Sequence, residues 1–380
     1  MGFLMKLKLG LQNYLVMNFD ENNAAESLKG LVLKERWKVI DKTTKVPGGT
    51  GGHFSIGYKV EDINNGTEGF LKALNFKAFF SQSKTKDILT VITEENSAFQ
   101  YERDVLLRCQ NFKLSKVVTL LDEGLANVEG FAIPQVPFLI FELADGDLYS
   151  KIEFSNKLDL LWKLKSLHDV AVGLKQLHWA NISHQDLKPS NVLLQQNGLV
   201  SKIADLGRSV CLEIQAPHEV KNGKFNGDSD YMPIEYYYKY EEPDWTKRTR
   251  STDMYLFGNL VCFYFTGLNM TTLIIRNTDK QFRWNNWNGS YTSVKDYLMV
   301  GFNKALNEFK SSILDERIKQ ELAKILQYCC FPYPEKRGHP RSIDLAGNQY
   351  EFHRTISRLD VILKETELNL IRHGGKLQNK

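Results

Sequence analysis

A short polar run near the middle of the chain constrains the fold more than any other feature. Residues 184–191 read His-Gln-Asp-Leu-Lys-Pro-Ser-Asn, which sets a carboxylate at Asp186, an ammonium group at Lys188 and an amide at Asn191. A second carboxylate, Asp205, follows two short apolar segments that read as a hairpin. The fold therefore has to place two polar loops at the ends of one hairpin.

These two loops resemble the catalytic loop and the metal-binding loop of the eukaryotic-type (Hanks-type) Ser/Thr protein kinase family. The resemblance implies that Asp186 orients the substrate hydroxyl and that Lys188 offsets the charge that grows on the γ-phosphate of ATP. It also implies that Asn191 and Asp205 are oxygen ligands of Mg²⁺. ATP and Mg²⁺ are thus the expected nucleotide and metal ion.

The resemblance also implies the fold class. We expect an α+β, bilobal protein-kinase-like fold, with a small β-rich N-lobe that holds one main helix and a larger α-helical C-lobe. The expected parts are an N-terminal extension at 1–36, an N-lobe at about 37–143, a C-lobe at about 144–345, and a C-terminal helix and tail at 346–380.

A glycine-dense turn between two predicted strands, within 48–60, resembles the glycine-rich loop of the family. Such turns let backbone N–H groups approach phosphate oxygens without interference from a Cβ atom. One residue is inserted in this loop, and Ser55 stands where the third glycine is expected. The glycines expected to contact the nucleotide are Gly49, Gly51 and Gly52.

Lys72, on a predicted strand, matches the lysine that holds the α- and β-phosphates in the family. Phe70 shares its strand face, because side chains two residues apart point the same way. The family usually has alanine at the position of Phe70 and valine at that of Gly57. We therefore expect the Phe70 ring to occupy volume left by Gly57 in the roof of the adenine pocket, which requires the two residues to lie on the same side of the sheet.

A helix predicted at 99–109 places Glu102 on the same face as apolar residues. A carboxylate on an inward-facing stripe needs a buried partner, and Lys72 is the expected one. Glu94 and Glu95 are alternatives, although both fall in a polar run typical of a solvated face.

The segment 143–148 resembles the hinge between the kinase lobes, and Phe141 before it corresponds to the gatekeeper. By this resemblance the residues expected to contact the adenosine are Glu142 and Ala144 through their backbone, Asp147 at the ribose, and Leu193 as the floor of the adenine pocket.

Three further matches imply structural roles. Glu235 and Arg337 correspond to the buried ion pair that anchors the end of the activation segment, and Asp253 corresponds to the residue that braces the catalytic loop. These roles require all three side chains to be buried and paired.

Two departures from the family bear on control. Gln185 replaces the arginine that receives a phosphorylated activation loop, so we expect activity without loop phosphorylation. Asp228 stands where a Ser/Thr kinase usually has threonine. Ser209 and Ser229 are candidate self-phosphorylation sites.

Composition excludes some other classes. A net charge of +4 with no long Lys/Arg run gives no support for nucleic-acid binding. Five cysteines without a C-x-x-C pair are typical of reduced thiols, and no apolar stretch approaches the length of a spanning helix or signal peptide. We expect a cytoplasmic protein with no membrane association.

Lys188 favours a Ser/Thr protein kinase over a tyrosine kinase, with protein substrates of unknown identity. A pseudokinase scaffold or allosteric partner is the main alternative, supported by the irregular glycine-rich loop, by Gly57 with Phe70, and by Asp228. A small-molecule kinase of the antibiotic-phosphorylating or choline-kinase type is the third. The aromatic segment around Trp284 and Trp287 is either a partner surface or a set of buried loop anchors.

Overall fold

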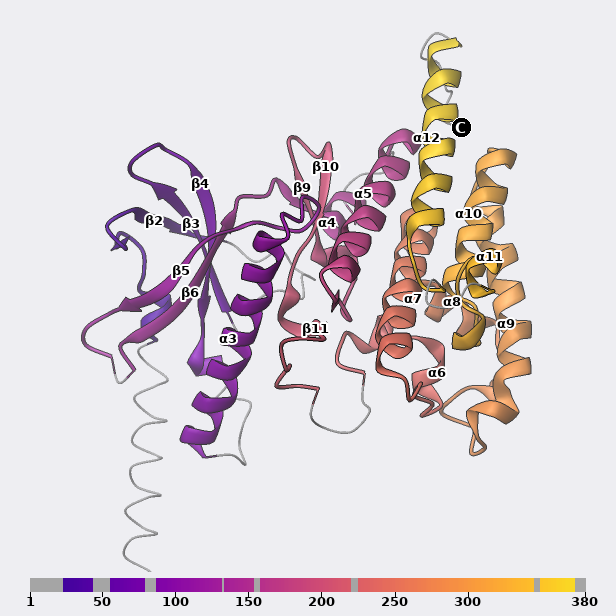
Figure 1. Ribbon diagram of the computed structural model, residues 1–380, viewed down its shortest axis with the longest axis horizontal. Helices are drawn as coiled ribbons and strands as arrows, with labels where there is room; N and C mark the ends of the chain where they lie inside the picture. The colour runs from indigo at the N-terminus through magenta and orange to yellow at the C-terminus, as the bar shows by residue number, and fades with distance from the viewer. Residues whose placement is uncertain are drawn as a thin grey trace, which may run out of the picture. The chain divides into compact units, whose positions relative to one another are not determined.

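A computed structural model describes residues 23–43, 55–78, 87–131, 133–153, 158–219, 225–344 and 349–372. The chain divides into two compact units (Figure 1). The first holds residues 1–113 and 118–144, and the second holds 114–117 and 145–380. Each unit is described by itself below.

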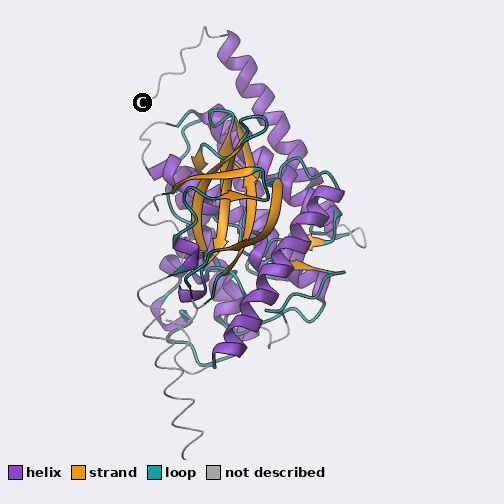
Figure 2. Ribbon diagram, turned by 90° about the vertical axis from the view of Figure 1, so that its left-hand side faces the viewer, coloured by secondary structure: helices purple, strands orange, loops and turns teal. Residues whose placement is uncertain are grey.

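The first unit is built on a six-stranded antiparallel sheet with strand order β1-β2-β3-β4-β6-β5. The strands are β1 (Val32–Leu33), β2 (Trp37–Lys42), β3 (Ser55–Asp62), β4 (Glu68–Leu74), β5 (Leu120–Asn127) and β6 (Gln135–Glu142). Its main helix, α3 (Ile88–Asn111), packs against β5, and a 3₁₀ turn, η1 (Ala24–Glu26), precedes β1. In Figure 2 these strands are the large orange sheet.

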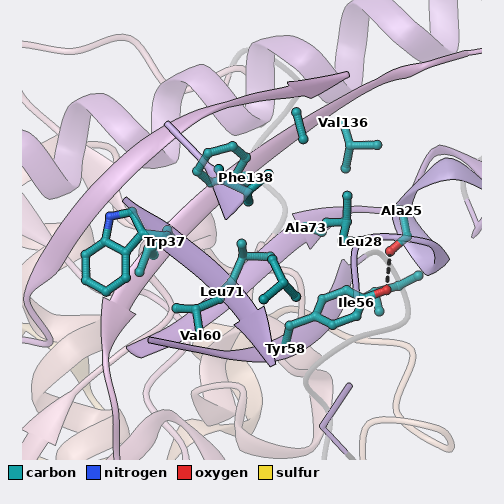
Figure 3. Close-up of a cluster of buried hydrophobic side chains, with 14 of the residues drawn as sticks. Ala25, Leu28, Trp37, Ile56, Tyr58, Val60, Leu71, Ala73, Val136 and Phe138 are labelled. Atoms are coloured by element: carbon teal, nitrogen blue, oxygen red, sulfur yellow. Dashed lines mark hydrogen bonds between the residues drawn. The ribbon is translucent and has the colours of Figure 1, made fainter. Parts of the chain in front are cut away.

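Strict alternation along β3 and β4 gives this sheet two different faces. Ile56, Tyr58, Leu71 and Ala73 point into a cluster of buried apolar side chains (Figure 3), and their neighbours along each strand point to the other face. The Tyr58 hydroxyl donates to the carbonyl oxygen of Ala25 (2.7 Å), so the phenol is satisfied inside the cluster. The face that carries Lys72 is therefore the one opposite this core.

Residues 23–36, which lie within the N-terminal extension expected at 1–36, pack on the sheet of this unit. Strand β1 pairs with β2, and Ala24, Ala25, Leu28 and Leu33 are members of the apolar cluster. An edge strand of two residues carries too little alternation to be recognised in the sequence. These apolar side chains extend the core beyond the predicted start of the domain.

The second unit is mainly helical. Its helices are α4 (Leu148–Glu153), α5 (Leu160–Trp179), α6 (Ile234–Tyr237), α7 (Trp245–Thr266), α8 (Met270–Asn277), α9 (Tyr291–Ser311), α10 (Glu316–Cys329), α11 (Pro340–Ile343) and α12 (His353–Arg372). Short 3₁₀ turns are η2 (Pro189–Asn191), η3 (Leu206–Arg208), η4 (Ser229–Tyr231), η5 (Lys280–Phe282) and η6 (Pro334–Lys336). A β-rich unit followed by a helical one confirms the expected α+β class.

Two small sheets carry the polar loops of this unit. Strands β7 (Gly146–Asp147), β9 (Val192–Gln195) and β10 (Val200–Ile203) form one, in the order β10-β9-β7. Strands β8 (Ile182–Ser183) and β11 (Val210–Cys211) form the other. The predicted hairpin is thus β9–β10, and the two polar loops lie at its ends.

Helix α7 is the centre of the second unit. Its side chains are buried almost continuously from Thr249 to Tyr264, and it packs against α5, α8 and α10. Among the described residues no single helix has the length and apolar character needed to cross a membrane; α7 and α8 reach that threshold only as a pair, with a bend of 83° at their break.

Candidate active site

The loop before β9 brings three predicted residues into direct contact in the second unit. The side-chain amide of Asn191 donates to the backbone oxygen of Asp186 (2.8 Å) and to its Oδ2 (3.2 Å). Lys188 Nζ lies 3.4 Å from the same Oδ2. All three residues are buried, and Pro189 starts the tight turn η2 that makes this spacing possible.

Asp253 on α7 holds the backbone of this loop. Its carboxylate accepts the backbone N–H groups of His184 and Gln185, both at 2.8 Å, and it is fully buried. His178 Nε2 lies 2.9 Å from the same carboxylate. The bracing role expected for Asp253 is present, and it holds Gln185 in a left-handed backbone conformation (φ 65°).

The side chain of Gln185 is also tied to α7. Its amide nitrogen donates to the carbonyl oxygen of Thr249 (2.8 Å) and to Asp253 Oδ1 (3.0 Å). A neutral amide takes part here in a buried network, whereas the family has a cationic guanidinium at this position.

Burial raises the pKa of the Asp186 carboxyl above its ordinary range, although the positive charge of Lys188 opposes this shift. The negative charge of Asp205 adds to the increase. The backbone N–H of Asp228 donates to Asp186 Oδ1 (2.6 Å), and the Asp228 carboxylate lies 3.2 Å from Lys188 Nζ. Lys188 is therefore shared between two carboxylates.

Sequence reasoning missed Gly227, which comes just before Asp228. A Cβ atom on this residue would lie 2.3 Å from the backbone oxygen of Gln185 and 3.0 Å from Asp186 Oδ1. Only glycine lets the chain approach the loop closely enough for the Asp228 N–H to reach Asp186. Nothing in the sequence separates this glycine from those of ordinary turns.

The residues expected to hold Mg²⁺ suit that ion. The contacts of the Asn191 amide nitrogen with Asp186 orient the amide, so its oxygen is the atom offered to a cation. Asp205 is exposed, starts the turn η3 with a left-handed backbone (φ 61°), and lies close enough to influence the pKa of Asp186. One carboxylate and one amide match the ligands of an ion that keeps several waters. Among the residues described, no group of three or more His, Cys, Asp or Glu side chains is arranged to hold a metal ion.

In the first unit, Lys72 on β4 pairs with Glu102 on α3. The Nζ atom lies 2.7 Å from Oε1 and 3.0 Å from Oε2, and the Glu102 side chain is only 9% exposed. The apolar face of the helix therefore identified Glu102 correctly as the partner of Lys72, in preference to Glu94 and Glu95.

The Phe70 ring lies over Gly57, as the volume argument requires. A Cβ atom on Gly57 would lie 2.7 Å from Cε2 of the ring, 2.9 Å from Cζ, and 2.4 Å from the hydroxyl oxygen of Thr43. The predicted exchange of volume between Phe70 and Gly57 is confirmed. The Thr43 hydroxyl also occupies the space beside Gly57, which the sequence did not indicate.

The other predicted nucleotide contacts are distributed along both units. In the first unit, Glu142 receives the backbone N–H of Thr119 on its carboxylate (2.8 Å) and donates its own N–H to the Thr119 oxygen (3.1 Å). Ala144 is the last residue of that unit. In the second unit, Asp147 and Leu193 are cross-strand partners, and the Asp147 carboxylate accepts hydrogen bonds from Ser150. Gly49, Gly51 and Gly52 lie outside the described residues.

Glu235 and Arg337 form a buried bidentate pair at 2.7 and 2.5 Å. The guanidinium also stacks on Tyr255, 4.6 Å from the ring centroid. Burial alone would lower the pKa of Arg337, but the charge and hydrogen bonds of the Glu235 carboxylate help to raise it above its ordinary value. The expected anchor of the activation segment is therefore present.

The aromatic segment combines both alternatives left open by its sequence. Trp284 is 47% exposed and packs on Tyr237, whereas Trp287 is half-buried and donates to the backbone oxygen of Ser290 (3.1 Å). Of the two candidate modification sites, Ser209 is fully buried and Ser229 is exposed.

The buried carboxylate of Asp186 beside Lys188 and Asn191, on a loop whose backbone is held by a second carboxylate, is typical of enzymes that transfer a phosphoryl group. The family model described as "Protein kinase domain" matches residues 52–344, which is more than half of the chain, so the chain belongs to the protein kinase family. The family expected from the two polar loops is thereby confirmed.

Curated relatives resemble shorter segments. The chain is 30% identical over 148 residues to a probable serine/threonine-protein kinase of Dictyostelium discoideum, which covers 37% of this chain and 32% of that protein. It is 34% identical over 121 residues to mitogen-activated protein kinase homolog 1 of Petunia hybrida (30% and 31%) and 32% identical over 135 residues to cyclin-dependent kinase-like 2 of Homo sapiens (34% and 25%). The match spans about a third or less of the length of these relatives.

Proposed function

We propose that this protein is an active kinase that transfers the γ-phosphate of ATP to serine or threonine hydroxyls of proteins. The observation that carries the proposal is the contact of Lys188 and Asn191 with the buried carboxylate of Asp186. Asp186 would accept a hydrogen bond from the attacking hydroxyl, and Lys188 would offset charge on the transferred phosphoryl group. The serine/threonine preference is supported by Lys188 and by the name of one distant relative, a probable serine/threonine-protein kinase.

Mg²⁺ would be held by Asp205 and the Asn191 amide oxygen, and it would neutralise negative charge on the phosphates. Lys72 would contact the α- and β-phosphates, with Glu102 fixing the position of its ammonium group. The acceptor is a protein whose identity is open, and the chain itself is one candidate.

Replacing Asp186 with asparagine tests this proposal directly. The Asp186→Asn variant should fold normally and retain less than about 1% of wild-type transfer, because positioned acid–base groups contribute roughly 10²- to 10⁴-fold. Phosphate transfer from radiolabelled ATP to generic protein substrates and to the chain itself is the measurement. Asp279→Asn is a matched control, since Asp279 is exposed and its side chain caps no backbone group. Full activity of Asp186→Asn would defeat the assignment.

We further propose that activity does not depend on phosphorylation of the activation loop. Gln185 supports this, because its neutral amide is engaged by Thr249 and Asp253 and offers no charge to a phosphate group. Ser209 is buried, which leaves Ser229 as the exposed candidate.

Phosphatase-treated protein and the Ser229→Ala variant should therefore phosphorylate an exogenous substrate at the rate of untreated wild type. Initial rates measured beside phosphosite mapping decide the matter. A large loss of rate after phosphatase treatment, restored by preincubation with ATP, would contradict independence from phosphorylation.

The second candidate function is that of a pseudokinase scaffold. The contact of Asp228 with Lys188 favours it, since a second carboxylate competes with phosphate for the ammonium group. A folded wild-type protein without any phosphate transfer would support this candidate.

A further inference from the structure

The face of the first unit that carries Lys72 also carries an aromatic ring in an unusual place. Phe70 lies two residues before Lys72 on β4 and is half-buried. Leu71 and Ala73, which alternate with them, point into the core cluster (Figure 3). Phe70 and Lys72 therefore share the face opposite that core.

Strand register places Phe70 between two expected contacts of the nucleotide. On β4 and β6, Gly69 pairs with Glu142, Phe70 with Phe141, and Lys72 with Leu139. A nucleotide whose phosphates lie at Lys72 and whose base edge lies at Glu142 has to cross the position of Phe70. The separation of Lys72 from the Gly69–Glu142 pair is about 10 Å along the strand.

The Phe70 ring packs against Gly57, where the absence of a side chain leaves room for it. The Cε2 and Cζ atoms of Phe70 occupy the space that a Cβ atom on Gly57 would need, and the Thr43 hydroxyl closes the same space. The backbone N–H of Thr43 donates to the Gly57 oxygen (2.9 Å), which keeps the end of β2 beside β3. The ring thus reaches across from β4 to β3.

We propose that Phe70 is the residue on which the nucleobase stacks, and that the absence of a side chain at Gly57 leaves the space that its ring occupies. The inference rests on the proposed function, because it takes Lys72 as the phosphate contact and Glu142 as a contact of the base. An aromatic ring offers a base a π-surface, which contributes more binding free energy than the aliphatic contacts of a small side chain. Affinity for nucleotide would then depend on ring stacking as well as on contacts to the base edge.

The test is the affinity of purified wild-type, Phe70→Leu and Phe70→Ala proteins for MgATP, measured by calorimetry. Leucine retains apolar bulk without a π-system, whereas alanine also removes the volume. Stacking predicts that both variants bind MgATP about 5- to 100-fold more weakly than wild type. Magnesium tripolyphosphate, which lacks a base, should bind all three proteins equally.

Melting temperatures verify that each variant is folded. Wild-type affinity in Phe70→Leu would overturn the stacking role and leave a volume effect. An equal loss of tripolyphosphate binding would also overturn it, because the variants would then have disturbed the site of Lys72. Failure of wild-type protein to bind MgATP would instead defeat the proposed function, so the two failures are distinguishable.

A second arm uses Gly57. The Gly57→Ala variant places a methyl group against the ring and should weaken MgATP binding in the wild-type background. The same change should have a smaller effect when Phe70 is already alanine. Equal effects in both backgrounds would show that Gly57 does not act through the Phe70 ring.

Discussion

Lys188 is held between the carboxylates of Asp186 and Asp228, at 3.4 and 3.2 Å. Burial raises the pKa of Asp186, and the positive charge of Lys188 opposes this increase. Transfer requires the ionised carboxylate, because only that form accepts a hydrogen bond from the substrate hydroxyl on either oxygen.

The raised pKa of Asp186 gives a prediction for pH dependence. Activity should fall as the pH is lowered through this pKa, so the acid limb of kcat/KM should lie above the ordinary range of an aspartate. Lys188→Met removes a positive charge that lowers the pKa, so the remaining activity should show an acid limb at still higher pH. Lys188→Arg, which retains the charge, is the control. An acid limb that stays in place in Lys188→Met would contradict the coupling.

At the residue scale, the sequence predicted those contacts that depend on strand or helix periodicity. Glu102 was identified by its apolar neighbours on α3 and the shared face of Phe70 and Lys72 by strand alternation, whereas Phe70 was paired with Gly57 because both depart from the family's usual residues. Gly227 could not be predicted, because its role depends on how closely two backbone segments approach, which no periodicity encodes. The Asp147 carboxylate accepts hydrogen bonds from Ser150, three residues along the chain, a local contact of the kind that caps the start of a helix.

At the scale of elements, α12 is an integral part of the second unit. Leu359 and Ile362 are buried, and the helix packs along α5. The Arg358 side chain also forms an ion pair with Glu321 of α10. The sequence predicted a helix in 346–380, and the residues that it packs against follow only from the fold.

Leu359→Ala should therefore lower the free energy of unfolding by about 2–5 kcal/mol, because it leaves a cavity in a fully buried position. Leu368→Ala on the same helix is the matched control, since Leu368 is 51% exposed and its truncation should change stability by less than about 0.5 kcal/mol. Urea unfolding followed by circular dichroism measures both. Equal, small effects would show that α12 does not contribute to the core.

At the scale of the whole molecule, the sequence predicted the class and the order of the two units because the kinase motifs occur in order. The contacts that residues 23–36 make in the first unit follow only from the fold, since this segment contains no motif and pairs through only two residues of β1. The first unit therefore begins earlier in the chain than the motifs do.

Ligand-linked stability separates an enzyme from a scaffold at this scale. MgATP at about 100 times its Kd should stabilise the folded chain by about 2.7 kcal/mol and raise Tm. Asp205→Asn should lose the part of this increase that requires Mg²⁺ and keep the part seen with ATP in EDTA. The measurement is the melting temperature of wild type and of Asp205→Asn, each with MgATP and with ATP in EDTA. A wild-type Tm that is indifferent to both ligands would favour the scaffold.

Three buried cysteines lie where α7 packs against α10, and they can report when the second unit opens. A Cβ atom on Gly258 would overlap Cys330, so the two helices are in close contact there, and Cys262, Cys329 and Cys330 are fully buried. Burial raises the pKa of Cys262 and of Cys329 to about 12, which suppresses the reactive thiolate at neutral pH. Alkylating reagents can therefore label these sulfurs only when the helices separate. The rate of alkylation, measured by mass spectrometry, therefore reports the rate at which these helices separate, and no engineered probe is needed.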